Sequence, residues 1–115
     1  MSDLLDNWTT QARKGILELA VLAALADKEC YAYELVKSVA QIPGLVISEG
    51  TIYPLLSRLR AQGMVTARLV ESAEGPARKY YSLTPEGRTT LEMMDNYMNT
   101  ILRGVQMLRS RKDQP

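Results

Sequence analysis

The sequence predicts a mainly α-helical fold with one small β-hairpin, an α+β class, and its pattern supports this in three ways. Three stretches with helical periodicity come first, a hairpin signal follows them, and another helical pattern ends the chain. The 115 residues are enough for one domain and too few for a second independent core.

Composition excludes several classes of protein. The 46% hydrophobic and 23% charged residues are close to globular averages, so we do not expect a disordered or fibrous chain. The longest apolar run, Ile16 to Ala26, is too short to span a membrane, and the acidic N-terminus does not look like a secretory signal. With only one cysteine, Cys30, the chain cannot build a disulfide framework. These features predict a cytoplasmic protein with no membrane partner.

The chain offers no catalytic chemistry that sequence alone can identify. It has no histidine, the commonest general base, and no nucleophile and base lie at usable spacing. No metal-binding motif is present, and we interpret Cys30 as a buried or semi-buried spectator rather than a redox sensor, because no histidine or second cysteine accompanies it. We therefore expect no enzyme, no catalytic or metal-binding residue and no cofactor.

The first two helices are predicted from apolar periodicity. The first begins near Leu4 or Thr10 and ends at Ala26, and from Ile16 onward it is apolar almost all round, which predicts burial on more than one side. The second is "YAYELVKSVAQI", which "PGL" stops. Its apolar stripe consists of Leu35, Val36, Val39 and Ile42.

The third helix, within "SEGTIYPLLSRLRAQGMV", has a face that suits docking into a groove. Its apolar face consists of Ile52, Leu55, Leu56 and Leu59, while Gly50, Pro54, Ser57 and Ala61 point the other way and Tyr53, Arg58 and Arg60 flank them. A helix selected only for solubility would carry Lys and Glu on the outward face. Two starts remain open, with Ser48 or Thr51 as N-cap, because Pro54 is better tolerated in the first turn. Gly63 is a plausible C′ residue that closes this helix.

A β-hairpin follows the third helix. The segments "MVTARLVE" and "RKYYSL" alternate in polarity as short strands do, and "SAEGPA" between them holds the turn residues Gly75 and Pro76. Arg78 and Lys79 then come just after the tip, one on each face, where they can lie along a phosphate backbone. Thr84 as N-cap and Pro85 as the first helical residue start the last helix.

The last helix carries a heptad seam that predicts a dimer. Apolar residues recur at spacings of three and four from Leu91 to Leu108, and one helix cannot bury such a seam alone. Tyr97 and Leu102 widen the stripe, so it can also pack against a partner's first helix. The alternative is that the seam packs back onto its own domain. The expected interface residues are Trp8, Ile16, Leu91, Met94, Tyr97, Met98, Ile101, Leu102, Val105 and Leu108.

Three helices followed by a two-stranded hairpin have the organisation of a winged helix-turn-helix domain. We expect residues 1–83 to form that domain, including the N-terminal helix, and residues 84–115 to form a C-terminal dimerisation helix and basic tail. The formal net charge is only +1, but residues 54–82 are locally basic, with Arg58, Arg60, Arg68, Arg78 and Lys79 against Glu71 and Glu74. Such a local stripe can meet DNA phosphates, although it can also be an ordinary solvated face.

Several motifs resemble those of the PadR family of bacterial transcriptional regulators, specifically its short members. They are "YAYEL", "GTIYPLLSRL", "GMV" and "EGPARKYYSLTPEG", in that order, and the resemblance covers about residues 12–108. It implies a winged helix, a homodimer built with the C-terminal helix, operator binding and, often, release of DNA by a small aromatic or amphipathic ligand. Some members place a tryptophan of the last helix in an interfacial drug-binding pore. Here Trp8 is the only tryptophan, and the last helix has Tyr97 with Met93, Met94 and Met98 instead.

We therefore expect a dimeric DNA-binding regulator, a repressor of a nearby operon, that binds an inverted-repeat operator in double-stranded DNA and can bind a small effector at the dimer interface. The expected DNA-binding residues are Tyr33, Lys37, Ser48, Gly50, Thr51, Tyr53, Pro54, Ser57, Arg58, Gly75, Arg78 and Lys79. The rival hypothesis is a winged-helix module whose hairpin and third helix bind protein. The cations on the third helix and the wing favour DNA.

Overall fold

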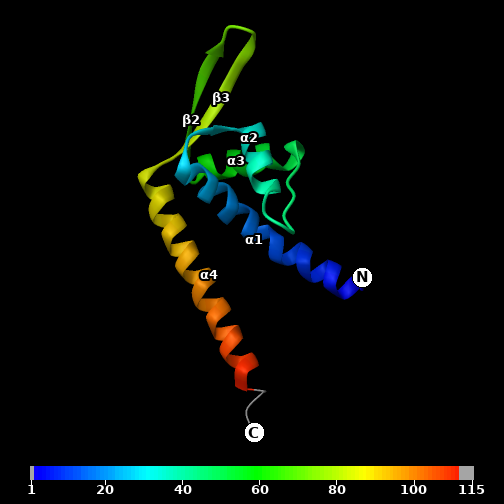
Figure 1. Cartoon of the computed structure of the whole chain (residues 1–115). Helices are drawn as coiled ribbons and strands as arrows, with labels where there is room; N and C mark the ends of the chain where they lie inside the picture. The colour runs from blue at the N-terminus through cyan, green and yellow to red at the C-terminus, as the bar shows by residue number, and fades with distance from the viewer. Residues whose placement is uncertain (1, 112–115) are drawn as a thin grey trace.

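The computed structural model describes residues 2–111, in which helices and a small sheet form one core and a long last helix leaves it (Figure 1). The elements are α1 (Asp3–Asp27), β1 (Cys30–Tyr31), α2 (Ala32–Ala40), α3 (Glu49–Ala61), β2 (Val65–Ser72), β3 (Gly75–Leu83) and α4 (Pro85–Arg111). This is the predicted α+β class. Residues 112–115, which include the end of the predicted basic tail, lie outside the described residues.

The core lies between the C-terminal half of α1, helices α2 and α3, and the inner face of the sheet. Its most buried side chains are Val21, Leu22, Leu25, Cys30, Leu35, Val39, Ile52 and Leu56. Of the two predicted starts for the first helix the earlier is correct, because Ser2 caps α1 by accepting the Leu5 N–H at 3.3 Å. The N-terminal turns of α1 extend past the core, and Trp8 there is 65% exposed.

Helix α2 is shorter than predicted at both ends. Tyr31 is not helical, because it pairs with Tyr80 in a strand. At the other end α2 stops at Ala40, and Ile42, predicted to belong to the apolar stripe, lies in the following turn and is 43% exposed. Pro43 explains this end, since a residue before proline is disfavoured in the helical region. The rest of the stripe is correct: Leu35 and Val39 are buried and Val36 is half-buried.

Helix α3 begins after Ser48, so Pro54 lies inside it rather than in its first turn. A proline there leaves the Gly50 carbonyl without its helical donor, and Gly50 is exposed. The helix ends as predicted. Gly63 has a positive φ of 78°, its N–H donates to Arg60 O at 3.0 Å, and the Met64 N–H donates to Leu59 O at 2.9 Å.

The sheet has three strands in the order β1-β3-β2, all antiparallel, whereas the sequence predicted two. The predicted turn was too long: only Ala73 and Glu74 lie between Ser72 and Gly75, and Pro76 belongs to β3. The pairing is irregular between Val70 and Ser72, which is where a proline without an N–H can be accommodated. Beyond the core the hairpin projects as a wing (Figure 1).

Helix α4 starts as predicted and then leaves the domain. Thr84 accepts the Gly87 N–H at 3.0 Å and donates its hydroxyl to Gly63 O at 2.6 Å, which ties the start of α4 to the end of α3. Leu91 and Met94 pack against the core. Tyr97 is 69% exposed, and the C-terminal part of α4 projects away from the rest of the chain (Figure 1).

Candidate nucleic-acid interface

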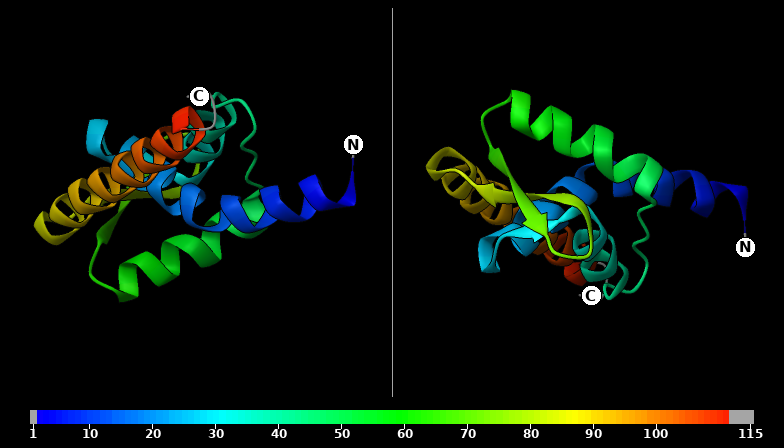
Figure 2. Two further views of the ribbon diagram at one scale, coloured as in Figure 1. Left: turned by 90° about the horizontal axis from the view of Figure 1, so that it is seen from below. Right: turned by 90° about the horizontal axis from the view of Figure 1, so that it is seen from above.

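One side of α3 is open along its length. The four side chains predicted to face inward are all buried, between 0% and 6% exposed, and the outward residues Gly50, Pro54, Ser57 and Ala61 are exposed. Figure 2 shows α3 at the edge of the domain, with its outer side covered by no other element. Small side chains on an uncovered helix let a large partner approach closely. This is the geometry expected of a helix that enters a DNA groove.

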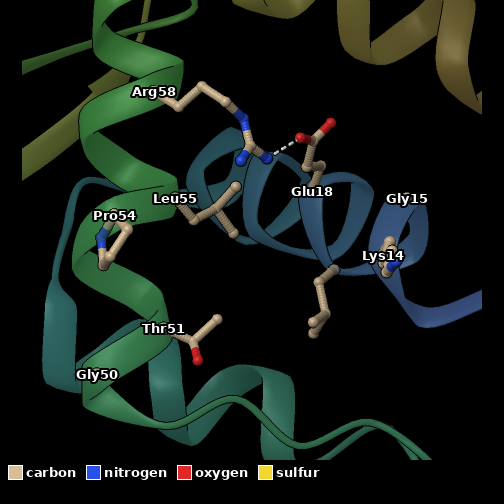
Figure 3. Close-up of a pocket in the computed structure, with 9 residues that line it drawn as sticks. Lys14, Gly15, Glu18, Gly50, Thr51, Pro54, Leu55 and Arg58 are labelled. Atoms are coloured by element: carbon tan, nitrogen blue, oxygen red, sulfur yellow. Dashed lines mark hydrogen bonds and ion pairs between the residues drawn. The ribbon is translucent and has the colours of Figure 1, made fainter. Parts of the chain in front are cut away.

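On one flank of α3, facing α1, a cleft of about 620 Å³ opens between the two helices (Figure 3). Thr51, Pro54 and Arg58 of α3 line it opposite Lys14 and Glu18 of α1. Arg58 was predicted as a DNA cation, but in the structure its guanidinium forms an ion pair with the Glu18 carboxylate. Its charge is therefore partly neutralised in the DNA-free protein.

The opposite flank faces the sheet. Tyr53 is exposed, and together with Arg60 it lies close enough to Tyr81 of β3 to influence that residue's titration. Burial raises the pKa of the Tyr81 hydroxyl above its ordinary value of 10.0. Arg60 makes no ion pair among the described residues. It is a flanking cation that was not among the predicted DNA-binding residues.

The wing carries its two cations on opposite faces, as predicted. Lys79, which pairs with Leu69, lies on the inner face of the hairpin, the face that packs against the helices closer to the core. Arg78 lies on the opposite, outer face. There the Arg78 guanidinium carbon lies 4.6 Å from the centre of the Tyr31 ring, which meets Tyr80 edge-on at 5.4 Å. Gly75, with a φ of 138°, is the first residue of β3 after the turn. Arg78, predicted to come just after the tip, lies three residues after Gly75 in β3.

At the base of the wing a carboxylate holds the sheet together. Glu29 accepts hydrogen bonds from Arg68 Nε at 2.9 Å, from Arg68 Nη2 at 2.5 Å and from the Ser82 hydroxyl at 3.2 Å. The bonds from Arg68 lower the pKa of Glu29 below its ordinary value of 4.5, although partial desolvation opposes them. The same pair raises the pKa of Arg68. Sequence reasoning counted Arg68 as a free cation and missed Glu29.

The remaining predicted DNA-binding residues lie on α2 and directly before α3. Tyr33 and Lys37 are exposed on α2, and the Lys37 ammonium lies 5.5 Å from the centre of the Tyr33 ring. Ser48 precedes α3, and its hydroxyl donates to Thr51 Oγ1 at 3.1 Å. The structure thus brings all the predicted residues to α2, α3 and the wing.

Away from α3, two apolar hollows follow α1 and α4. One of about 390 Å³ is lined by Gly15, Leu19, Thr90, Met93, Met94, Tyr97 and Met98. The other, about 440 Å³, lies between α1, the start of α4 and the loop after α2, and includes Ile16 and Leu91. Among the predicted interface residues Ile16, Leu91, Met94 and Met98 are half-buried, while Trp8, Tyr97, Ile101, Leu102, Val105 and Leu108 are exposed. Burial of Leu91 and Met94 agrees with the alternative that the seam packs on its own domain, but only for its first turns.

No metal site is formed within residues 2–111, where acidic and cysteine side chains never gather in groups of three or more that could hold an ion. In the same part of the chain no helix is long and apolar enough to cross a membrane. Burial raises the pKa of the Cys30 thiol above its ordinary value of 9.0, and its Sγ lies 3.4 Å from Lys28 O. A buried, protonated thiol fits the predicted structural role.

Comparison with known proteins decides the family, since the model of the transcriptional regulator PadR-like family matches residues 21–93. The chain belongs to the PadR-like family. It is 33% identical over 79 residues to the transcriptional regulator Rv3488 of Mycobacterium tuberculosis, which covers 69% of this chain and 72% of that protein. The resemblance seen in the sequence motifs is thereby confirmed.

Solved PadR-family structures share the whole fold. The regulator from Eggerthella lenta superposes with a TM-score of 0.81 at 33% identity, covering 92% of each chain. A PadR-like regulator from Bacillus cereus gives a TM-score of 0.76 at 35% identity, covering 85% of this chain and 95% of its own. The winged helix is therefore confirmed. Members of this family are transcriptional regulators that bind DNA as dimers, and they are not enzymes.

Proposed function

We propose that this PadR-like protein is a dimeric repressor of a neighbouring operon, which binds an inverted repeat through α3 and the wing. The exposed small-residue side of α3 carries this proposal, because it is flanked by Tyr53 and Arg60 on one side and by Thr51 and Arg58 on the other. Small residues allow close approach to base edges, and the flanking groups can bond to phosphates or bases. Residues 1–83 carry this DNA-binding surface.

Residues 84–115 are proposed to supply the dimer contact. The exposed turns of α4, from Tyr97 to Leu108, present an apolar face that the chain itself leaves uncovered. The exposed N-terminal turn of α1, which includes Leu4, Leu5 and Trp8, is a second apolar surface for the partner. Two-fold symmetry then requires two α3 helices and two wings on one operator.

A gel-shift assay with the DNA upstream of the protein's own gene tests the proposal. Ser57→Glu places a negative charge on the exposed side of α3, and we expect it to abolish the shift while the free energy of unfolding changes by no more than about 0.5 kcal/mol. Ser110→Glu is the matched control, because Ser110 is also helical and exposed but lies near the end of α4. Equal binding by both variants contradicts the proposal, and so does a wild-type protein that does not shift this DNA.

An effector that releases the DNA is the finer part of the proposal. The hollow of about 390 Å³ between α1 and α4 supports it, because methionines and Tyr97 give it a deformable apolar lining of a size that suits a small aromatic or amphipathic molecule. Movement of α4 there would change the spacing of the two α3 helices in a dimer. Such a change would weaken binding to a fixed inverted repeat.

The effector can be tested with 8-anilinonaphthalene-1-sulfonate, an amphipathic aromatic probe. A Cβ added at Gly15 would meet nothing within 4 Å, so Gly15→Met can enter the hollow and Gly15→Ala leaves most of it open. Because Gly15 also borders the cleft beside α3, both variants must first bind the upstream DNA as wild type does. We expect the probe to bind wild type and Gly15→Ala, to bind Gly15→Met much more weakly, and to release DNA only from the first two. Binding of the probe without release of DNA contradicts the effector role.

A further inference from the structure

Glu29 reaches across the sheet at the base of the wing. It lies directly before β1, yet it bonds to Ser82 of β3 and to Arg68 of β2. Because β3 lies between the other two strands, no backbone pairing joins β1 to β2 in the described sheet. The Glu29 carboxylate therefore fastens the edge strand of the wing to the segment between α1 and α2.

The backbone attachment of the wing is small. β1 pairs with β3 at only two positions, Cys30 with Tyr81 and Tyr31 with Tyr80. On the outer face, beside these pairs, lie the Tyr31–Tyr80 contact and the Arg78 guanidinium over Tyr31. Glu29 adds two hydrogen bonds from Arg68 on the same outer face. Arg68 belongs to β2, the strand that does not pair with β1.

Small changes at this base are amplified at the turn. From Arg68 to Ala73 the strand rises about 16 Å, so a tilt of about 10° at the base moves the turn by about 3 Å. A hydrogen bond to a phosphate oxygen is lost when its donor–acceptor distance grows by about half an ångström. The direction in which the wing leaves the domain therefore decides whether Gly75 and its neighbours can reach the DNA backbone.

We propose that Glu29 is a positioning residue for DNA binding: by holding Arg68 and Ser82 it sets the direction of the wing without touching DNA. This rests on the proposed function, in which the wing contacts the phosphate backbone. The competing explanation is that Arg68 itself contacts phosphate and Glu29 masks it. The two differ in sign, because removal of a masking negative charge would strengthen DNA binding, whereas loss of the wing's anchor weakens it.

The test measures affinity for the upstream DNA with Glu29→Gln, Arg68→Gln and the exchange variant Glu29→Arg with Arg68→Glu. Both side chains are partly exposed, 30% for Glu29 and 65% for Arg68, so each single variant should weaken binding by about two- to five-fold per wing, or about four- to 25-fold for a dimer. The exchange variant should return to within about two-fold of wild type, since the pair is restored with its charges reversed. Glu71→Gln, which removes an exposed charge from the same strand, is the control and should bind at least as tightly as wild type.

A second readout separates positioning from a local loss of charge. Residual dipolar couplings of the amides in β2 and β3, measured without DNA, should change in Glu29→Gln relative to those of α2, and should return in the exchange variant. Tighter or unchanged binding by Glu29→Gln overturns the proposal. Failure of the exchange variant to recover, or unchanged couplings in a weaker binder, also overturns it. A wild-type protein that binds no DNA rejects the proposed function and this role together, whereas wild-type binding with an indifferent Glu29 rejects this role alone.

Discussion

Arg58 of α3 is held by Glu18 of α1, so one flank of the helix that we propose enters the DNA groove is paired before DNA arrives (Figure 3). Both side chains are partly exposed, 52% and 31%, and such a pair is screened by water and salt. A phosphate can therefore compete for the guanidinium at small cost. We therefore expect the pair to lower the apparent affinity for DNA without preventing binding.

Glu18→Gln should accordingly strengthen DNA binding. We expect the affinity to rise by about two- to five-fold per subunit at low salt, because Arg58 no longer has to leave a carboxylate. Fluorescence anisotropy over a series of salt concentrations measures it. Glu92→Gln is the control, as Glu92 is exposed on α4 and lies far along the chain from α3. Weaker binding by Glu18→Gln would show that the pair orients α3 instead of competing with phosphate.

The two wing cations should differ in their effect on DNA binding. Arg78 lies over the Tyr31 ring on the outer face, whereas Lys79 lies on the face shared with the helices and has no ion-pair partner among the described residues. Lys79→Ala should therefore weaken binding to all sequences and reduce the slope of log affinity against log salt by about 0.9 for each wing. Arg78→Ala should change that slope less. If Arg78→Ala reduces the slope more than Lys79→Ala does, the outer face of the wing is the one that contacts DNA.

Gly87 should be required for the junction between α3 and α4. A Cβ at Gly87 would lie 2.1 Å from the Met64 carbonyl oxygen, and the Thr84 N–H bonds to the same oxygen at 3.1 Å. Gly87→Ala should lower the free energy of unfolding by about 1–3 kcal/mol, as overpacking does. Gly104→Ala, where a Cβ meets nothing within 4 Å, should instead raise it by about 0.5–1 kcal/mol through helix propensity. Urea unfolding measures the free energy of unfolding of both variants. If Gly87→Ala and Gly104→Ala change it equally, Gly87 does not lie as close to the Met64 carbonyl as the structure shows.

Met98 and Ile101 should be needed for the dimer. Met98 is half-buried and Ile101 is 46% exposed in the single chain, so their remaining surface is available to a partner. Met98→Asp with Ile101→Asp should give a folded monomer with only non-specific affinity for DNA, because each charge buried at an interface costs several kcal/mol. Sedimentation reports the mass. The control variant Asn96→Asp with Asn99→Asp changes the polar side of α4 and should remain dimeric. If the variant with Met98→Asp and Ile101→Asp is still a dimer, α4 does not form the interface.

Periodicity predicted the elements and the orientation of α3 because burial follows directly from which residues are apolar. Ile52 and Leu56 are buried and Ser57 is exposed for that reason. It did not predict β1, since two residues have no period and their pairing with β3 depends on tertiary structure. The position of Pro54 inside α3 was also undecided, because the pattern allowed two starts; in the structure the Ile52 N–H donates to Ser48 O at 2.9 Å, so the helix begins at Glu49 and tolerates one lost helical hydrogen bond at Pro54.

The electrostatics of the candidate interface could not be predicted from the sequence. Glu18 and Glu29 are 40 and 39 residues from the arginines that they hold, and nothing local marks either pair. Counting charges therefore overstated the free cations, because Arg58 and Arg68 are both paired. Arg78 and Lys79 were correctly predicted to lie on opposite faces, but the contact of Arg78 with Tyr31 requires the register of β1 with β3.

A hydroxyl-radical footprint of the wild-type protein on the DNA upstream of its own gene tests the central claim most directly. A symmetric dimer that inserts two α3 helices into successive major grooves should protect two segments related by a dyad, with centres about 10 bp apart or a multiple of that spacing. Protection at the wings should extend to the flanking backbone and fade as salt rises. No protection, or one unbroken segment without a dyad, would contradict the account.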